Sequence, residues 1–165
     1  MADEHLADIT MGLTQAPLQL TKAVKIAAGP EEVFAKLTDY AAMPGWFPGM
    51  TEVVTDNSAA EAENGTGAVR VCSFGPERMT EDIVLFEPPA KLAYAVRDGN
   101  FMGMSGHLAL ITVEPEEGGS LVTWRQFFEH PDAEAFNEQG GAMLEAALNN
   151  VSSHFRATQS SGLLS

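Results

Sequence analysis

The chain has 165 residues, of which 45% are hydrophobic and 19% are charged, a composition typical of one folded domain and not of a disordered or membrane-spanning chain. Its 23 acidic residues outnumber the nine basic ones, and the formal net charge of −14 repels nucleic acids and anionic lipid surfaces. We therefore expect no nucleic acid and no membrane insertion among its interactions, whereas a homodimer remains open.

The placement of cysteine and histidine gives no sign of a metal or redox site. Cys72 is the only cysteine, so no intrachain disulfide or Cys-x-x-Cys pair exists, and the four histidines are too widely spaced for a metal-binding signature. Phosphate-binding loops and dinucleotide fingerprints are also absent from the sequence. Residues 1–11 mix acidic with apolar side chains, unlike a signal peptide. We therefore expect a cytoplasmic protein that uses no metal and no cofactor.

The first third of the chain predicts an arm, a strand and two short helices. Residues 1–17 show only a weak helical pattern, so we expect an N-terminal arm before a single domain at residues 18–158. Residues 18–27 alternate apolar and polar side chains, as a strand does. Pro30 and the two glutamates after it are typical of a helix N-terminus, and Asp39 is a candidate cap for a second, brief helix.

Six further strand-like runs follow, separated by turn signals such as Asn64-Gly65. Their connections are too short for parallel crossovers, which predicts an antiparallel meander. Beyond the last run, apolar residues recur every three or four positions and predict one amphipathic helix of about 20 residues, followed by a flexible tail at residues 159–165. Within this helix, Gly140-Gly141 indicates a kink or a close approach by another group. The six runs cover residues 51–55, 67–74, 78–86, 91–97, 102–114 and 120–129.

Side chains alternate between the two faces of a strand, so residues two positions apart share a face. Where apolar residues of a run must be buried, the polar residues on the same face therefore point inward as well. The run 67–74 is ambiguous, because the face with Arg70 and Cys72 competes with the face of Val69 and Val71. The predicted inward residues are Met79, Glu81, Ile83 and Leu85 on run 78–86, Leu92, Tyr94 and Val96 on run 91–97, His107, Ala109, Ile111 and Val113 on run 102–114, and Val122, Trp124, Gln126 and Phe128 on run 120–129.

Several local markers appear in order along the chain. They are Gly-Pro-Glu-Glu-Val-Phe at residues 29–34, the segment 39–46, Thr-Glu-Asp-Ile-Val-Leu-Phe-Glu-Pro-Pro at 80–89 and Gly-Ser-Leu-Val-Thr-Trp at 119–124. Together with the order of predicted elements, they resemble the SRPBCC or START-like (Bet v 1-like) superfamily, whose bacterial members include polyketide cyclase/dehydrase and lipid-transport proteins. The resemblance covers residues 18–158. It implies an α+β helix-grip fold: a seven-stranded curved antiparallel sheet wrapped around a long C-terminal helix, with two short helices between strands 1 and 2 and a cavity inside.

The chain also resembles the plant hormone-receptor branch of this superfamily, in which residues aligned with Arg70, Glu81, Tyr94, His107, Trp124 and Gln126 lie on the cavity side. The gate loop of those receptors is not recognisable at residues 73–76, so the resemblance implies no hormone-receptor function. Methionines such as Met43, Met50, Met102 and Met104 are expected to contribute an adaptable apolar wall. The expected ligand contacts are Trp46, Arg70, Cys72, Glu81, Tyr94, His107, Trp124, Gln126, Phe128, Met143 and Leu144.

Glu81 and His107 are the candidate catalytic residues. A carboxylate and an imidazole that converge in a dry cavity can move protons to and from a carbonyl or enol. In the alternative interpretation, Glu81 pairs with Arg70, and His107 binds a polar ligand atom or a backbone group. Cys72 has no legible activating partner and is expected to be a small buried hydrophobe.

Two functions fit these residues. The first is binding of a hydrophobic small molecule, such as a lipid, a quinone or an aromatic, polyketide-like compound, by a carrier or sensor. The alternative is a polyketide aromatase/cyclase or dehydratase that uses Glu81 and His107 as acid and base. The sequence leaves open whether turnover occurs and which ligand is bound.

Overall fold

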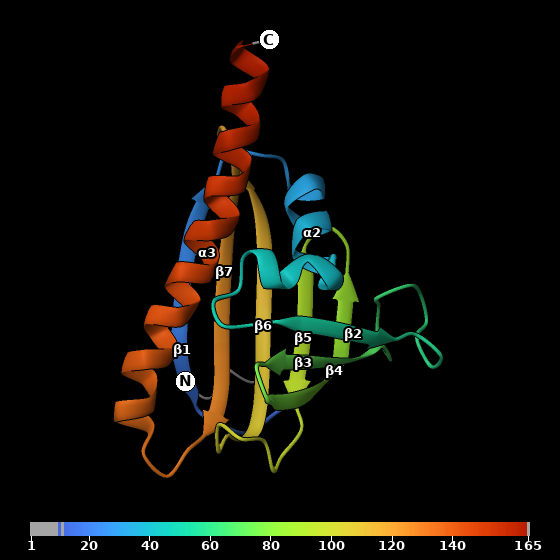
Figure 1. The fold of residues 1–165 in the computed structure, drawn as a ribbon, viewed down its shortest axis with the longest axis vertical. Coiled ribbons are helices and arrows are strands. Elements are labelled where there is room, and N and C mark those ends of the chain that lie inside the picture. The colour runs from blue at the N-terminus through green and yellow to red at the C-terminus, as the bar shows by residue number, and fades with distance from the viewer. Residues whose placement is uncertain (1–9, 11, 165) are drawn as a thin grey trace.

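The computed structural model describes residue 10 and residues 12–164, with side chains described as far as residue 156; residues 1–9 and 11 of the predicted arm lie outside the described residues. One antiparallel sheet has the strand order β1-β7-β6-β5-β4-β3-β2 (Figure 1). The elements are β1 (Leu18–Ile26), α2 (Pro30–Thr38), the 3-10 helix η1 (Tyr40–Gly45), β2 (Glu52–Asp56), β3 (Val69–Phe74), β4 (Glu77–Glu87), β5 (Lys91–Val96), β6 (Ser105–Glu116), β7 (Gly119–Glu129) and α3 (Ala133–Leu164).

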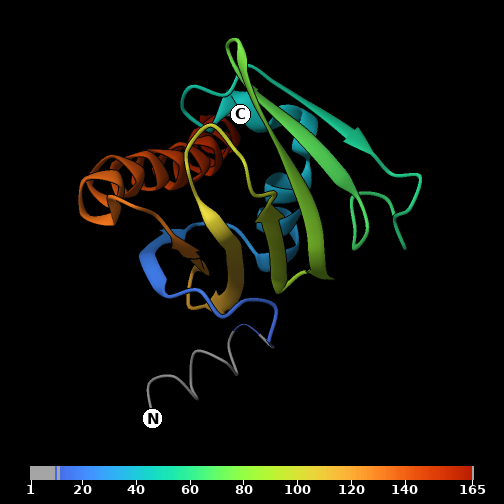
Figure 2. The ribbon, with the colours of Figure 1, turned by 90° about the horizontal axis from the view of Figure 1, so that it is seen from below.

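The sheet is curved, and its helices lie on the concave side. Figures 1 and 2 show α3 running alongside β1, while α2 packs against β6 and β7 and η1 lies beside β2. The main apolar core fills the space between these two groups of helices and the sheet. This arrangement confirms the predicted α+β helix-grip fold, with seven antiparallel strands and two short helices between the first two strands.

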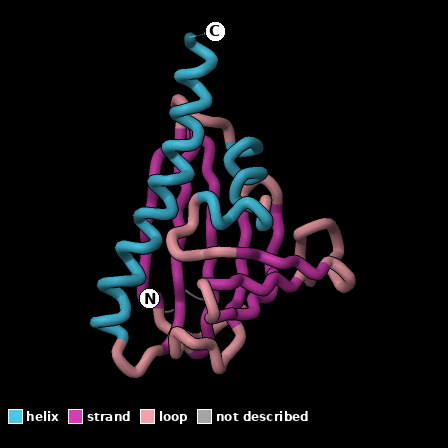
Figure 3. The backbone as a smooth tube through the Cα atoms, viewed as in Figure 1, coloured by secondary structure: helices cyan, strands magenta, loops and turns pink. Residues whose placement is uncertain are grey.

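The helices differ from the sequence predictions in two details. Pro30 begins α2 as expected, but Asp39 forms no side-chain cap at the start of η1, so the predicted cap is wrong. The C-terminal helix has 32 residues, and residues 159–164, which we expected in a tail, belong to its last turns. Figure 3 shows these turns extending past the ends of the strands.

Within the described residues, no helix combines the length and the hydrophobicity needed to cross a bilayer.

A bulge in β4 overturns one prediction about the faces of the sheet. The pairing of β4 with β5 shifts register between Ile83 and Leu85. Ile83 packs into the main core, but Leu85 packs against a smaller apolar cluster, and Phe86 takes the inward position beside Phe34 of α2, at 5.5 Å between ring centroids. The prediction that Leu85 faces inward is therefore wrong, because the extra residue of the bulge reverses the alternation.

The smaller cluster comprises residues of β5, β6 and β7 whose side chains point away from the helices. Ala16, just before β1, and Leu18, at its start, pack against this cluster. The Thr14 hydroxyl donates a hydrogen bond of 2.7 Å to the carbonyl of Gly106. The segment before β1 therefore packs on the convex side of the sheet. The buried members of the cluster are Ala93, Leu108, Leu110 and Phe127.

Candidate functional site

A cavity of about 220 Å³ lies between η1, strands β3 to β7 and α3. Most of its wall is apolar, and all six methionines of the described chain line it. Because methionine is flexible and polarisable, such a wall adapts to apolar molecules of different shapes. The methionines are Met43, Met50, Met79, Met102, Met104 and Met143; Leu20, Phe47, Phe74, Val96, Phe136, Gly140 and Leu144 complete the apolar lining, and the polar lining consists of Arg70, Glu81, Tyr94, His107, Gln126 and Gln139.

Arg70 and Glu81 form a buried ion pair at the polar part of this cavity. They face each other across the β3–β4 ladder, and they are only 1% and 5% exposed. Arg70 Nε donates to Glu81 Oε1, and Nη1 contacts the sulfur of Met43 at 3.4 Å. This geometry settles the ambiguity of run 67–74, since Arg70 and Cys72 are buried while Val69 and Val71 are only partly covered.

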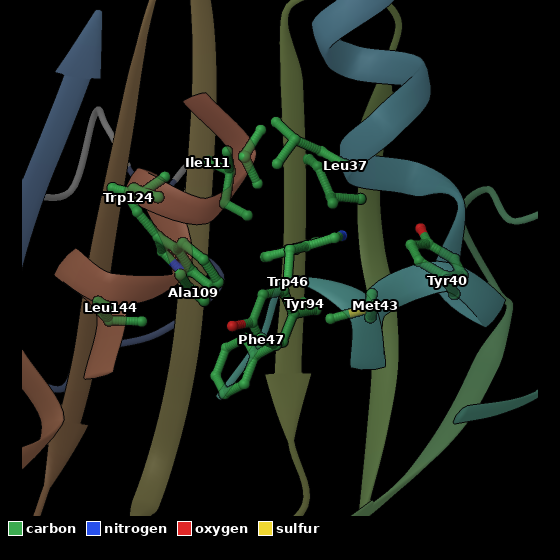
Figure 4. Packing of buried hydrophobic residues seen from close by; sticks show 14 of the residues in the cluster. Leu37, Tyr40, Met43, Trp46, Phe47, Tyr94, Ala109, Ile111, Trp124 and Leu144 are labelled. Atoms are coloured by element: carbon green, nitrogen blue, oxygen red, sulfur yellow. The ribbon is translucent and has the colours of Figure 1, made fainter. Parts of the chain in front are cut away.

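Two tyrosine rings enclose the Arg70 guanidinium. Its central carbon lies 4.7 Å from the ring centroid of Tyr40 and 4.4 Å from that of Tyr94, within the range of cation–π attraction. Figure 4 shows Tyr40 and Met43 on η1 and Tyr94 on the strand opposite. Burial by itself lowers the pKa of Arg70, but Glu81, together with the smaller effects of Cys72, Tyr94 and Tyr40, more than offsets this, and the pKa lies above its ordinary value. The guanidinium is therefore permanently charged, and its charge is already paired.

The phenols and the thiol around this ion pair are neutral. Burial raises the pKa of Tyr40 to about 12 and raises the pKa of Tyr94 well above its ordinary value. Burial, followed by the nearby Glu81 charge, raises the pKa of the Cys72 thiol, which contacts Glu81 Oε1 at 3.4 Å. Cys72 is therefore a buried thiol and not an activated nucleophile, because nucleophilic cysteines need a lowered pKa.

The position of His107 depends on where the β5–β6 pairing ends and where the β6–β7 pairing shifts. The regular β5–β6 pairing ends at Tyr94 and Ala109, and the β6–β7 pairing shifts between Ser105 and Leu108. At this interruption the backbone N–H of Val96 donates to Nδ1 of His107, at 3.0 Å, where continued pairing would have offered a strand carbonyl. The bulge thus directs the imidazole into the cavity, as bulges near functional sites commonly do.

The hydrogen bonds of His107 define its protonation state. Because Nδ1 accepts the Val96 N–H, the proton of the neutral ring is on Nε2, which donates to Gln126 Oε1 at 2.8 Å. Burial lowers the pKa of His107, and the hydrogen bond to Gln126 and the Glu81 charge only partly oppose this. The imidazole is therefore neutral, and both of its nitrogens are engaged.

Seven of the eleven expected ligand contacts line the cavity: Arg70, Glu81, Tyr94, His107, Gln126, Met143 and Leu144. The other four lie behind its wall. Trp46 and Trp124 pack edge-to-face with ring centroids 6.3 Å apart, Phe128 stacks beside His107 at 6.3 Å, and Cys72 is covered by the ion pair. Phe47, which lines the cavity, packs against both tryptophans, with its ring centroid 6.1 Å from that of Trp46 and 5.9 Å from that of Trp124.

Sequence analysis missed several lining residues, chiefly Phe136, Gln139 and Gly140 on α3. A usable signal existed, because these positions share a helical face with Met143 and Leu144 at spacings of three, four and seven residues. Leu20, Phe47 and Phe74 were also missed; for Phe47, nothing in a proline-rich connection shows which side chain points inward.

Comparison with known proteins agrees with this architecture. The sequence pattern of the family described as polyketide cyclase / dehydrase and lipid transport matches residues 17–156, and the chain belongs to this family. A search of curated proteins found no match.

Solved structures share the fold at low sequence identity. The protein XoxI from Bacillus cereus is 20% identical, with 84% of this chain and 96% of that chain covered and a TM-score of 0.68. The di-domain ARO/CYC protein StfQ from the steffimycin biosynthetic pathway is 10% identical, with 93% of this chain and 56% of that chain covered and a TM-score of 0.72. The Aha1 dimer from Colwellia psychrerythraea is 12% identical, with 82% and 94% covered and a TM-score of 0.65.

The buried imidazole makes stability depend on pH. The unfolded chain binds a proton at His107 near the ordinary pKa of about 6.5, whereas the folded chain resists protonation, so stability falls as the pH drops below that value. One such group changes the free energy of unfolding by up to ~1.4 kcal/mol per pH unit. We expect His107→Asn, which keeps an acceptor for Val96, to be less stable at pH 7 but to lose less stability between pH 7 and pH 5. Urea unfolding across this range measures both slopes; equal slopes would contradict the buried neutral state.

The adjacent glycines of α3 provide a matched pair of variants. A Cβ at Gly140 would lie 3.4 Å from Leu20 Cδ1 and one at Gly141 3.4 Å from Lys22 Cε, both ordinary contacts, but only Gly140 lines the cavity. Replacement by alanine favours a helix by up to ~1 kcal/mol. We therefore expect both G140A and G141A to raise the unfolding free energy, and only G140A to weaken binding of naphthalene, measured by calorimetry. Equal binding by both variants would show that Gly140 does not shape the cavity.

Proposed function

We propose that this protein binds a small molecule with an apolar body and one polar end, as a carrier or sensor and without catalysing its conversion. The cavity wall has a large apolar part and a small polar part, and this supports the proposal. Methionines and aromatic rings form its larger part, and a compact group around Arg70, Glu81, His107 and Gln126 forms its polar part. A few polar groups within an apolar pocket orient a ligand, while burial of its apolar body supplies most of the affinity.

The cavity volume limits the size of the ligand. Pockets for drug-sized ligands measure roughly 300–1,000 Å³, whereas this cavity measures about 220 Å³. A ring system or a short acyl group fits this volume. A long lipid would enter with one end and leave the remainder outside, or would require the methionine wall to rearrange.

The pairing of the polar side chains supports binding over catalysis. A general acid or base must have a proton or a lone pair that can reach the substrate. Glu81 Oε1 is held by Arg70 and Cys72, and the Nδ1 lone pair of His107 is occupied by a backbone N–H. Catalysis by His107 would therefore require one of its two hydrogen bonds to break first, whereas Glu81 is restrained through its ion pair with Arg70. This favours the interpretation in which Glu81 pairs with Arg70.

The carrier function predicts that a bulky residue in the cavity blocks binding. Met143 lines the cavity from α3, whereas its neighbour Ala142 faces solvent. We expect M143W to lose the stabilisation that ligands give the native chain, about 2.7 kcal/mol at a ligand concentration of 100 times Kd, and A142W to retain it. Native mass spectrometry with lipids, quinones and polyphenols would find the ligands, and thermal shifts would compare the variants. The proposal fails if no compound binds the native chain or if M143W binds undiminished.

The second candidate function is a polyketide aromatase/cyclase or dehydratase. It is favoured by the family description, which includes cyclases and dehydrases, and by the presence of Glu81 and His107 in the same cavity wall. In that case His107→Ala abolishes turnover of a poly-β-ketone substrate, assayed by mass spectrometry of products, and leaves substrate binding intact. An unchanged rate in this variant would contradict the acid–base assignment.

A further inference from the structure

The orientation of the Gln126 side chain is determined by hydrogen bonds that begin at the backbone. A backbone N–H can only donate, so the Val96 N–H requires a lone pair on His107 Nδ1 and places the ring proton on Nε2. Nε2 then requires an acceptor, which is Oε1 of Gln126 at 2.8 Å. The carbonyl half of the amide is thereby used, and its NH2 half is directed elsewhere.

The NH2 group of Gln126 is a donor available to a ligand. Gln126 lines the cavity and is only 8% exposed, so bulk water has little access to it. Within the described part of the chain, no hydrogen bond uses its amide nitrogen. This nitrogen is not among the side-chain atoms that are sealed off without a partner, so it opens onto the cavity, where a ligand that accepts a hydrogen bond can engage it.

The charges around the cavity disfavour an anionic ligand. Arg70 is the only lysine or arginine among its described lining residues, and its charge is paired with Glu81 between two tyrosine rings. The polar part therefore has a formal charge of zero, and the net charge of the whole chain is −14. A carboxylate entering the cavity would lose its hydration without meeting an uncommitted cation.

We infer that the polar end of the ligand is a neutral hydrogen-bond acceptor, such as a ketone, quinone or amide carbonyl, which receives a hydrogen bond from the amide nitrogen of Gln126. This inference rests on the proposed function and makes it more specific. In this arrangement Gln126 is the residue that contacts the ligand. His107 is a positioning residue that acts through it.

Three naphthalenes of matched shape test this assignment: 2-acetylnaphthalene, 2-naphthoate and 2-ethylnaphthalene. They differ only in whether the substituent is a neutral acceptor, an anion or an apolar group. We expect the native chain to bind the ketone about tenfold more tightly than the hydrocarbon, and the carboxylate most weakly, in calorimetric titrations at pH 7.5. In Gln126→Met the ratio of ketone to hydrocarbon affinity, measured in the same variant, should fall to about one.

Binding of 2-ethylnaphthalene shows in each variant that the fold and the cavity persist. His107→Met leaves the Gln126 amide free to rotate, so the ratio of ketone to hydrocarbon affinity in this variant should fall to a few-fold. If the carboxylate binds as tightly as the ketone, or if the preference survives in Gln126→Met, the inference is wrong and the proposed function stands. If none of the three compounds binds the native chain, both the proposed function and the inference fail.

Discussion

The buried ion pair of Arg70 and Glu81 is the constraint on which the rest of the site depends. Both charges are almost completely buried, so each requires the other, and the register of β3 against β4 places them directly opposite. Removing one partner of such a pair costs about 3–5 kcal/mol, because the remaining charge stays buried and unpaired. Tyr40 and Tyr94 complete the enclosure of the guanidinium. This pairing leaves the cavity formally neutral although ionised groups lie in its wall.

A second constraint comes from backbone pairing. Where β5 separates from β6, a backbone N–H without a strand partner binds the imidazole of His107, and this contact orients Gln126. Which hydrogen-bonding groups face the cavity thus depends on the pairing of β5 with β6 as well as on the identity of the side chains. In a continuous ladder the Val96 N–H would donate to a strand carbonyl, so nothing would fix the tautomer of His107 or the orientation of the Gln126 amide.

The family shares an architecture that encloses a cavity, but a fold does not determine its chemistry. In this chain both ring nitrogens of His107 are hydrogen-bonded and Glu81 is paired with Arg70, while the apolar wall is built from residues that adapt to shape. Both features favour recognition of a ligand over its conversion. The cavity volume restricts that ligand to a compact molecule, or to the end of a longer one.

Periodicity in the sequence determined the elements, their antiparallel order and the inward face of most strands, because a residue's face follows from local alternation. It placed Glu81, Tyr94, His107 and Gln126 on the cavity side, but failed at Leu85, where a bulge reverses the faces. Periodicity left open whether Arg70 or Val69 turns inward; the family resemblance implied Arg70, and the tertiary structure places it there. Tertiary structure alone decided that the two tryptophans pack behind Phe47. Those outcomes depend on which strands pair in which register and on how deeply η1 packs, and these are contacts between segments far apart in the chain.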